Sequence, residues 1–145
     1  MHALAQVAHF DLESDRFSAA TVMKAVNFHL KPAPIVIRHA MEAEPDFHSR
    51  FSAIKRSYLY RILNRPAPAA LDHGRVWHVP QELDAAAMHD AAQALIGKHD
   101  FTTFRAKHCQ AQSPEKTLDM LRVSRVGEEI HLNPHARSFL NPQIR

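Results

Sequence analysis

The sequence predicts an α+β fold in which a largely antiparallel sheet has helices packed on one side. Three observations lead to this prediction. Residues 51–63 alternate side chains as a strand does, and residues 84–97 carry apolar side chains at helical spacing. Residues 117–133 indicate two strands joined by a short turn. Strands and helices that are separate rather than strictly alternating favour α+β over a parallel α/β sheet.

The first fifty residues carry signals for two strands and one helix. Residues 5–12 place β-compatible side chains at alternate positions and predict a strand, and residues 35–40 predict a second one. Between them, Ser18 is placed to cap a helix whose apolar side chains recur at helical spacing. We expect Lys31-Pro32 to end this helix.

Residues 51–63 form the longest predicted strand. Tyr58, Tyr60 and Ile62 lie on one face of it. Two aromatic residues beside basic ones on a sheet suit an RNA surface, although Tyr60 is expected to belong to the core. Residues 65–80 then predict a loop, because proline and glycine interrupt them repeatedly.

A second helix is predicted to follow Asp84, which is an N-cap residue type. Met88 and Leu95 lie on one face of this helix. Gly97 stands where a residue of left-handed conformation is expected after the helix.

The last part of the chain predicts a hairpin and a helix start. Residues 117–126 and 130–133 are predicted strands, and residues 127–129 are the connection between them. Asn141-Pro142 has the pattern of an N-cap followed by the first residue of a helix.

The composition favours a polyanionic partner and a reducing compartment. Lys and Arg exceed Asp and Glu by three, and the sequence pI is about 9.3. The chain has one cysteine, no long apolar run and no signal-peptide pattern at its start, so we expect a cytoplasmic protein without a membrane span. Twelve histidines raise the alternative of a metal hydrolase, but they show no zinc-ligand spacing, and no metal is expected.

An ordered set of short motifs extends over nearly the whole chain and resembles the tRNA pseudouridine synthase A (TruA) family. The motifs are, in order, Q-V-A-H-F at 6–10, D-F-H-S-R-F-S-A at 46–53, R-S-Y-L-Y at 56–60, G-K-H-D-F-T-T-F-R-A at 97–106, C-Q at 109–110, S-P at 113–114 and A-R-S-F-L at 136–140. The resemblance implies a pseudouridine synthase fold, incomplete here, with residues 1–50 in the N-terminal lobe and residues 51–145 in the C-terminal lobe. It also implies a homodimer in the complete protein.

The resemblance implies an isomerase that acts without cofactor or metal. Such an enzyme is an intramolecular transferase that converts uridine to pseudouridine at positions 38–40 of the tRNA anticodon stem-loop. It breaks the bond from C1′ to N1, turns the uracil and rejoins it through C5, using a carboxylate that acts on the sugar. In the family this aspartate belongs to R-T-D-A-G-V-H-A. His2 and Ala3 match the end of that motif, so the aspartate is expected before Met1.

The resemblance assigns roles to twelve residues. Tyr58 matches the tyrosine that packs against the target base, and Arg145 matches the arginine that pairs with the catalytic carboxylate. The residues expected to contact RNA are Phe47, His48, Ser49, Arg50, Phe51, His108, Cys109, Gln110, Ala111 and Gln112. An alternative function is a non-catalytic RNA-binding remnant that keeps these contacts but lacks the aspartate.

Overall fold

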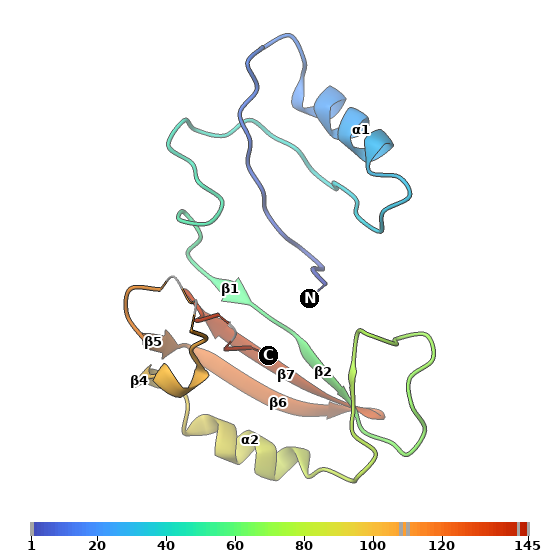
Figure 1. Ribbon diagram of the computed structural model, residues 1–145, viewed down its shortest axis with the longest axis vertical. Helices are drawn as coiled ribbons and strands as arrows, with labels where there is room; N and C mark the ends of the chain where they lie inside the picture. The colour runs from blue at the N-terminus through green and yellow to red at the C-terminus, as the bar shows by residue number, and fades with distance from the viewer. Residues whose placement is uncertain (1, 108, 110, 142, 145) are drawn as a thin grey trace. The chain divides into compact units, whose positions relative to one another are not determined.

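The computed structural model describes residues 2–107, 109, 111–141, 143 and 144, and the chain divides into two compact units. We call Ala5–Ser52 the N-terminal unit and Met1–Leu4 together with Ala53–Arg145 the C-terminal unit. Helices and mostly antiparallel strands are both present (Figure 1), which confirms the α+β class. None of the helices in the described ranges is long and apolar enough to cross a membrane.

The main sheet of the C-terminal unit is built around one long strand. This strand, β7 (Glu129–Ala136), pairs antiparallel with β6 (Met120–Val126) on one side. On its other side it pairs antiparallel with β1 (Arg56–Ser57) and β2 (Tyr60–Leu63). The short strand β3 (Trp77–His78) adds to β2 in the parallel direction.

Helix α2 (Ala85–Gln93) covers one face of this sheet and packs mainly on β6 (Figure 1). The helix begins where predicted, because the Asp84 side chain accepts hydrogen bonds from the backbone N–H groups of Ala86 and Ala87. Its contact with the sheet closes a core whose buried members are Ile62, Ala92, Val123 and Ile130. Each large aliphatic side chain buried there contributes on the order of 2 kcal/mol to folding.

A smaller sheet lies next to a second apolar cluster. It pairs β4 (Gly97–Asp100) antiparallel with β5 (Glu115–Leu118), and the short helix η1 (Thr102–Phe104) follows β4. The buried members of this cluster are Phe101, Leu118, Ala136 and Leu140. Because Ala136 belongs to β7, the cluster joins the two sheets of the unit.

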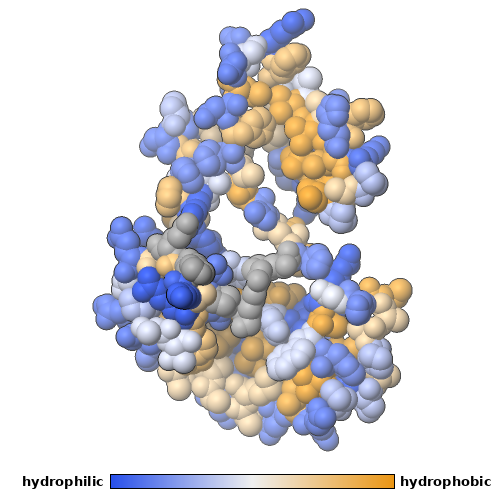
Figure 2. Space-filling view, viewed as in Figure 1, coloured by the Kyte–Doolittle hydropathy of each residue, from blue (hydrophilic) through white to orange (hydrophobic). Residues whose placement is uncertain are grey.

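The N-terminal unit contains one helix, α1 (Ala19–His29), and it starts after Ser18 as predicted. The Ser18 side chain accepts from the backbone N–H of Thr21, and the helix ends before Lys31. Every residue that the structure describes as buried lies in the C-terminal unit, whereas large apolar side chains of the N-terminal unit are exposed (Figure 2). Phe28, for example, is 70% exposed.

Two strands predicted in the N-terminal unit are wrong. Residues 5–12 and 35–40 are all described, and both run as irregular chain without strand pairing. The second segment is held instead by the Asn27 side chain of α1, which donates to the Ile37 carbonyl oxygen at 2.8 Å and accepts from the Ile37 N–H at 2.7 Å. Alternating side chains make a strand only where a partner supplies backbone hydrogen bonds, and neither segment has one.

The predicted strand at 51–63 is shorter than expected and interrupted. Residues 51–55 lie outside any strand, and β1 and β2 are separated at Tyr58. Tyr58 still donates its backbone N–H to the Pro134 carbonyl oxygen at 3.2 Å. Proline has no backbone N–H, so Pro134 cannot donate a hydrogen bond back to Tyr58. The regular exchange of two hydrogen bonds between β7 and its neighbour is therefore incomplete at this position.

The hairpin is confirmed, but the strands that flank it differ from the prediction. The loop has two residues, and Gly127 stands first with a φ of 60°, which favours glycine. The predicted strand 117–126 is two strands in different sheets, divided at Asp119.

Three other local predictions have mixed outcomes. The strand β3 lies within the predicted loop 65–80. Gly97 has the expected positive φ, 103°, but α2 has already ended at Gln93, so this glycine begins β4. The helix predicted from Asn141 depends on Pro142, which lies outside the described residues.

Candidate functional site

Tyr58 is half-buried in the gap between β1 and β2. Its ring meets that of Phe139 edge to face, with the ring centres 5.2 Å apart and the planes at 82°. This geometry is the preferred one for an aromatic pair. Phe139 in turn packs on the second apolar cluster, so it ties the Tyr58 ring to that cluster while Tyr58 as a whole stays only half-buried.

Tyr60 has a different environment, in agreement with the expected core position. It packs against the main apolar core, and its ring lies edge to face with Trp77 at 6.4 Å. The two tyrosines therefore contact different clusters although they are only two residues apart.

The five predicted RNA-contact residues at 47–51 form a compact turn in the N-terminal unit. The His48 carbonyl oxygen accepts from the Ser52 N–H at 2.8 Å, and the His48 N–H donates to the Ser52 hydroxyl at 3.0 Å. The His48 Nδ1 atom accepts from the backbone N–H groups of Arg50 and Phe51 at 3.2 and 3.4 Å. His48 thus caps the turn in the way that an aspartate or asparagine caps a helix.

This turn exposes a basic and an aromatic side chain together. The Arg50 guanidinium lies 5.7 Å from the centre of the Phe51 ring, and Phe51 is 72% exposed. A guanidinium over an aromatic ring offers both a phosphate ligand and a stacking surface for an unpaired base.

Two described residues of the predicted contact segment, Cys109 and Ala111, are held by an arginine. The Arg105 Nη2 atom donates to the carbonyl oxygens of Ala111 and Cys109, at 2.6 and 3.3 Å. Backbone N–H groups of Ala111 and Asn141, followed by the Arg105 guanidinium, hold the pKa of the Cys109 thiol below its ordinary value. Gln112 is exposed at the end of the segment.

Three of the predicted site residues fall outside the described part of the chain. These are His108, Gln110 and Arg145. The roles assigned to them stay predictions. In the parts that are described, no group of three His, Cys, Asp or Glu residues is arranged to hold a metal ion.

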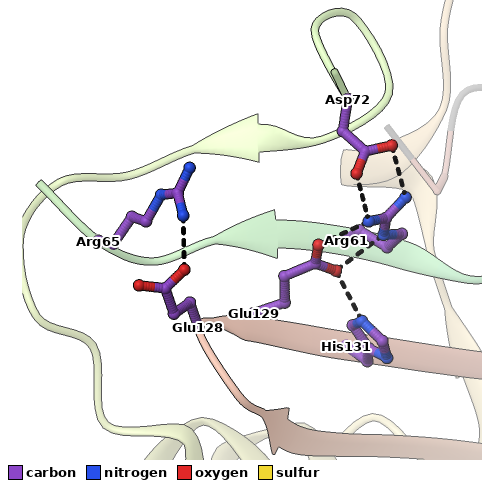
Figure 3. Close-up of polar contacts among 6 residues, drawn as sticks. All are labelled: Arg61, Arg65, Asp72, Glu128, Glu129 and His131. Carbon is purple, nitrogen blue, oxygen red and sulfur yellow. Dashed lines mark hydrogen bonds and ion pairs between the residues drawn. The ribbon is translucent and has the colours of Figure 1, made fainter. Parts of the chain in front are cut away.

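A charged cluster on β2 and β7 was not anticipated from the sequence (Figure 3). Arg61 donates to both carboxylate oxygens of Glu129, at 2.7 and 2.5 Å, and it also forms two hydrogen bonds with Asp72. His131 contacts the same Glu129 carboxylate at 2.8 Å. Hydrogen bonds from Arg61, and then from His131, lower the pKa of Glu129 from 4.5 to about 2. Hydrogen bonds to Glu129, and then to Asp72, raise the pKa of Arg61, so Arg61 and Glu129 both stay ionised and act as structural ties rather than as acid or base.

Two residues missed by sequence reasoning position the predicted ones. Arg105 holds the carbonyl groups of Cys109 and Ala111, and His9 contacts the turn at 47–51 through hydrogen bonds to Ser49 and a ring contact to His48. Both lie inside the quoted motifs, but a motif does not show which neighbour a side chain contacts.

Comparison with known proteins supports the predicted family. A model of the family described as tRNA pseudouridine synthase matches residues 91–145. The chain is 60% identical over 145 residues to a protein of Rhodospirillum rubrum named tRNA pseudouridine synthase A, and the match covers 100% of the chain and 52% of that relative.

Two further relatives with the same name give the same result. The protein of Caulobacter vibrioides is 60% identical and that of Parvibaculum lavamentivorans 54% identical, each over 145 residues and 58% of the relative's length. The chain thus spans a little over half the length of the relatives it matches.

Proposed function

We propose that this chain, which belongs to the tRNA pseudouridine synthase family, forms part of an enzyme that isomerises uridine to pseudouridine at positions 38–40 of the tRNA anticodon stem-loop. The observation that carries the proposal is the identity of 54–60% over all 145 residues to relatives of that name. The motifs around Tyr58 and the turn at 47–51 lie inside this matched region.

In this proposal Tyr58 packs against the extruded uracil. The ring is held edge-on by Phe139 and is only half-buried, so it has a supported side and a side open to a ligand. The reaction breaks the bond from C1′ to N1, forms one from C1′ to C5, and moves the C5 proton to N1 through a base. It needs no oxidant, so a carboxylate, an aromatic platform and a proton acceptor are sufficient.

The carboxylate is placed by this proposal in an R-T-D-A-G segment outside residues 1–145. None of the 15 acidic residues in the sequence stands in such a motif. Arg145 is proposed as its ion-pair partner, because an opposite charge keeps a carboxylate ionised.

The tRNA backbone is proposed to contact both predicted RNA segments. Arg50 beside Phe51 supplies a charge and a stacking surface, and segment 108–112 supplies polar side chains such as Gln112. We further propose that residues 1–50 and 51–145 belong to the N-terminal and C-terminal lobes of the synthase domain, and that the complete protein is a cytoplasmic homodimer. Light scattering of the complete enzyme tests the dimer.

The second candidate is a non-catalytic RNA-binding protein. It is favoured by one observation, the lack of an R-T-D-A-G motif within the 145 residues. The two candidates agree on RNA binding and differ in catalysis.

A chimera separates these candidates. This chain replaces the matched region of the Rhodospirillum rubrum relative, and pseudouridine formation is measured on an unmodified anticodon stem-loop RNA. If the chimera is active and the 145-residue chain alone is inactive, the result supports the proposed enzyme function. An inactive chimera that still folds and binds the RNA favours the second candidate.

Two matched substitutions in the chimera test the role of Tyr58. Tyr58→Leu removes the platform and is expected to reduce the rate at saturating RNA by at least about 100-fold. Tyr60→Leu lies two residues away in the core and is expected to lower thermal stability instead. Equal rates for the Tyr58 variant and the unsubstituted chimera would exclude the assigned role.

A further inference from the structure

The turn at 47–51 is held by two imidazole nitrogens that both accept hydrogen bonds. The Nδ1 atom of His48 accepts from two backbone N–H groups within the turn. The Nδ1 atom of His9 lies 3.4 Å from the Ser49 nitrogen, whose N–H it accepts, and 3.0 Å from the Ser49 hydroxyl oxygen. A ring nitrogen that accepts from an N–H carries no proton itself, so in this arrangement Nδ1 is the acceptor atom of each ring.

His9 connects two segments that are 40 positions apart in the sequence. Its own segment, residues 5–12, forms no strand, so the ladder expected there does not hold it in place. The ring instead lies 4.4 Å from the His48 ring centre and 6.3 Å from that of Phe47. Hydrogen bonds and ring contacts thus converge from one side chain on three successive residues of the turn.

We propose that His9 is a positioning residue for the turn at 47–51, and that its Nδ1 atom, as a hydrogen-bond acceptor, keeps the surface formed by Arg50 and Phe51 in place. The part of this inference that concerns RNA rests on the function proposed above. The part that concerns the turn rests on the hydrogen bonds of His9 and His48 alone.

Asparagine gives a variant that keeps the acceptor without the imidazole ring. The side-chain oxygen of asparagine can accept at the place of Nδ1. His9→Asn should therefore keep the turn, whereas His9→Leu should lose it. His39→Leu, an exposed histidine of the same unit, serves as the matched control.

The first test is NMR of the 145-residue chain labelled with ¹⁵N. We expect the His9 ring at pH 8 to carry its proton on Nε2. The Ser49 amide should exchange with solvent about ten-fold faster in His9→Leu than in the wild type, because a net hydrogen bond is worth about one decade in an equilibrium. A proton on Nδ1, or an unchanged Ser49 amide in His9→Leu, would overturn the positioning role.

The second test is binding to anticodon stem-loop RNA, followed by fluorescence anisotropy at pH 8. The wild type, His9→Asn and His39→Leu should bind alike, and His9→Leu about ten-fold more weakly. Equal affinities of the wild type and His9→Leu would overturn the role of His9 in holding the RNA-contact surface.

The two tests also distinguish this inference from the proposed function. A wild-type chain that binds no stem-loop RNA at pH 8 overturns the RNA part of both proposals. The position of the His9 ring proton and the exchange rate of the Ser49 amide still decide whether His9 holds the turn. In the active chimera, His9→Leu should raise KM and leave kcat within about two-fold, because the turn binds RNA without contacting the reacting atoms.

Discussion

The charge of Glu129 is expected to stabilise the C-terminal unit by about 2 kcal/mol at neutral pH. A pKa lowered from 4.5 to about 2 corresponds to up to about 3 kcal/mol, since a tenfold change in proton affinity is worth about 1.4 kcal/mol. The side chains of Glu129 and Arg61 remain 18% and 28% exposed, and screening by water reduces this figure. Glu129→Gln removes the charge and keeps the shape, so it should lower the free energy of unfolding at pH 7 by about 2 kcal/mol.

The sign of the pH dependence of stability follows from the direction in which the pKa of Glu129 is shifted. The folded pKa is lowered, so the stabilisation is fully present above the ordinary value of 4.5 and is lost as the pH falls toward 2. Urea unfolding, followed by the fluorescence of Trp77 in the same unit, measures the difference between wild type and Glu129→Gln at pH 7 and pH 3. That difference should be clearly smaller at pH 3.

The adjacent residue provides the control for this experiment. Glu128 also pairs with an arginine, Arg65, but its side chain is 62% exposed (Figure 3). Glu128→Gln should therefore change the free energy of unfolding by less than about 0.5 kcal/mol. Equal effects of the two substitutions, or an effect of Glu129→Gln that is the same at both pH values, would refute the assignment.

Three further predictions concern the stability of the same unit. Asn64→Ala should lower the free energy of unfolding by about 2–4 kcal/mol, because the buried amide oxygen accepts from Leu83 and Arg125; a change below 1 kcal/mol in urea unfolding would contradict this. Gly127→Ala should cost about 1 kcal/mol and Gly127→Asn less, because the φ of 60° is easier for asparagine than for alanine; thermal unfolding of both variants ranks them. Ile130→Ala should cost about 3 kcal/mol, since Ile130 is 0% exposed, and calorimetry that found no loss would show that the core is not closed there.

Features set by neighbours in the sequence could be predicted. Both helix starts were located correctly, because Ser18 and Asp84 act on N–H groups only two or three residues away. The turn at Gly127 was found for the same reason, since a positive φ is a property of one residue. Such signals need no knowledge of the rest of the fold.

Strands could not be predicted with the same accuracy, because a strand depends on its partner. Residues 5–12 and 35–40 have strand-like sequences but lie in a unit without buried residues among those described. The interruption at Tyr58 depends on Pro134, which is 76 positions away and cannot donate an N–H. No window of sequence around residue 58 contains this information.

The site shows the same division between local and distant information. Motifs identified Tyr58 and the turn at 47–51 as candidates, but not the side chains that hold them. Phe139 supports Tyr58, and His9 supports Ser49, each across a long stretch of sequence. A motif names residue types in order, whereas support of this kind depends on the fold.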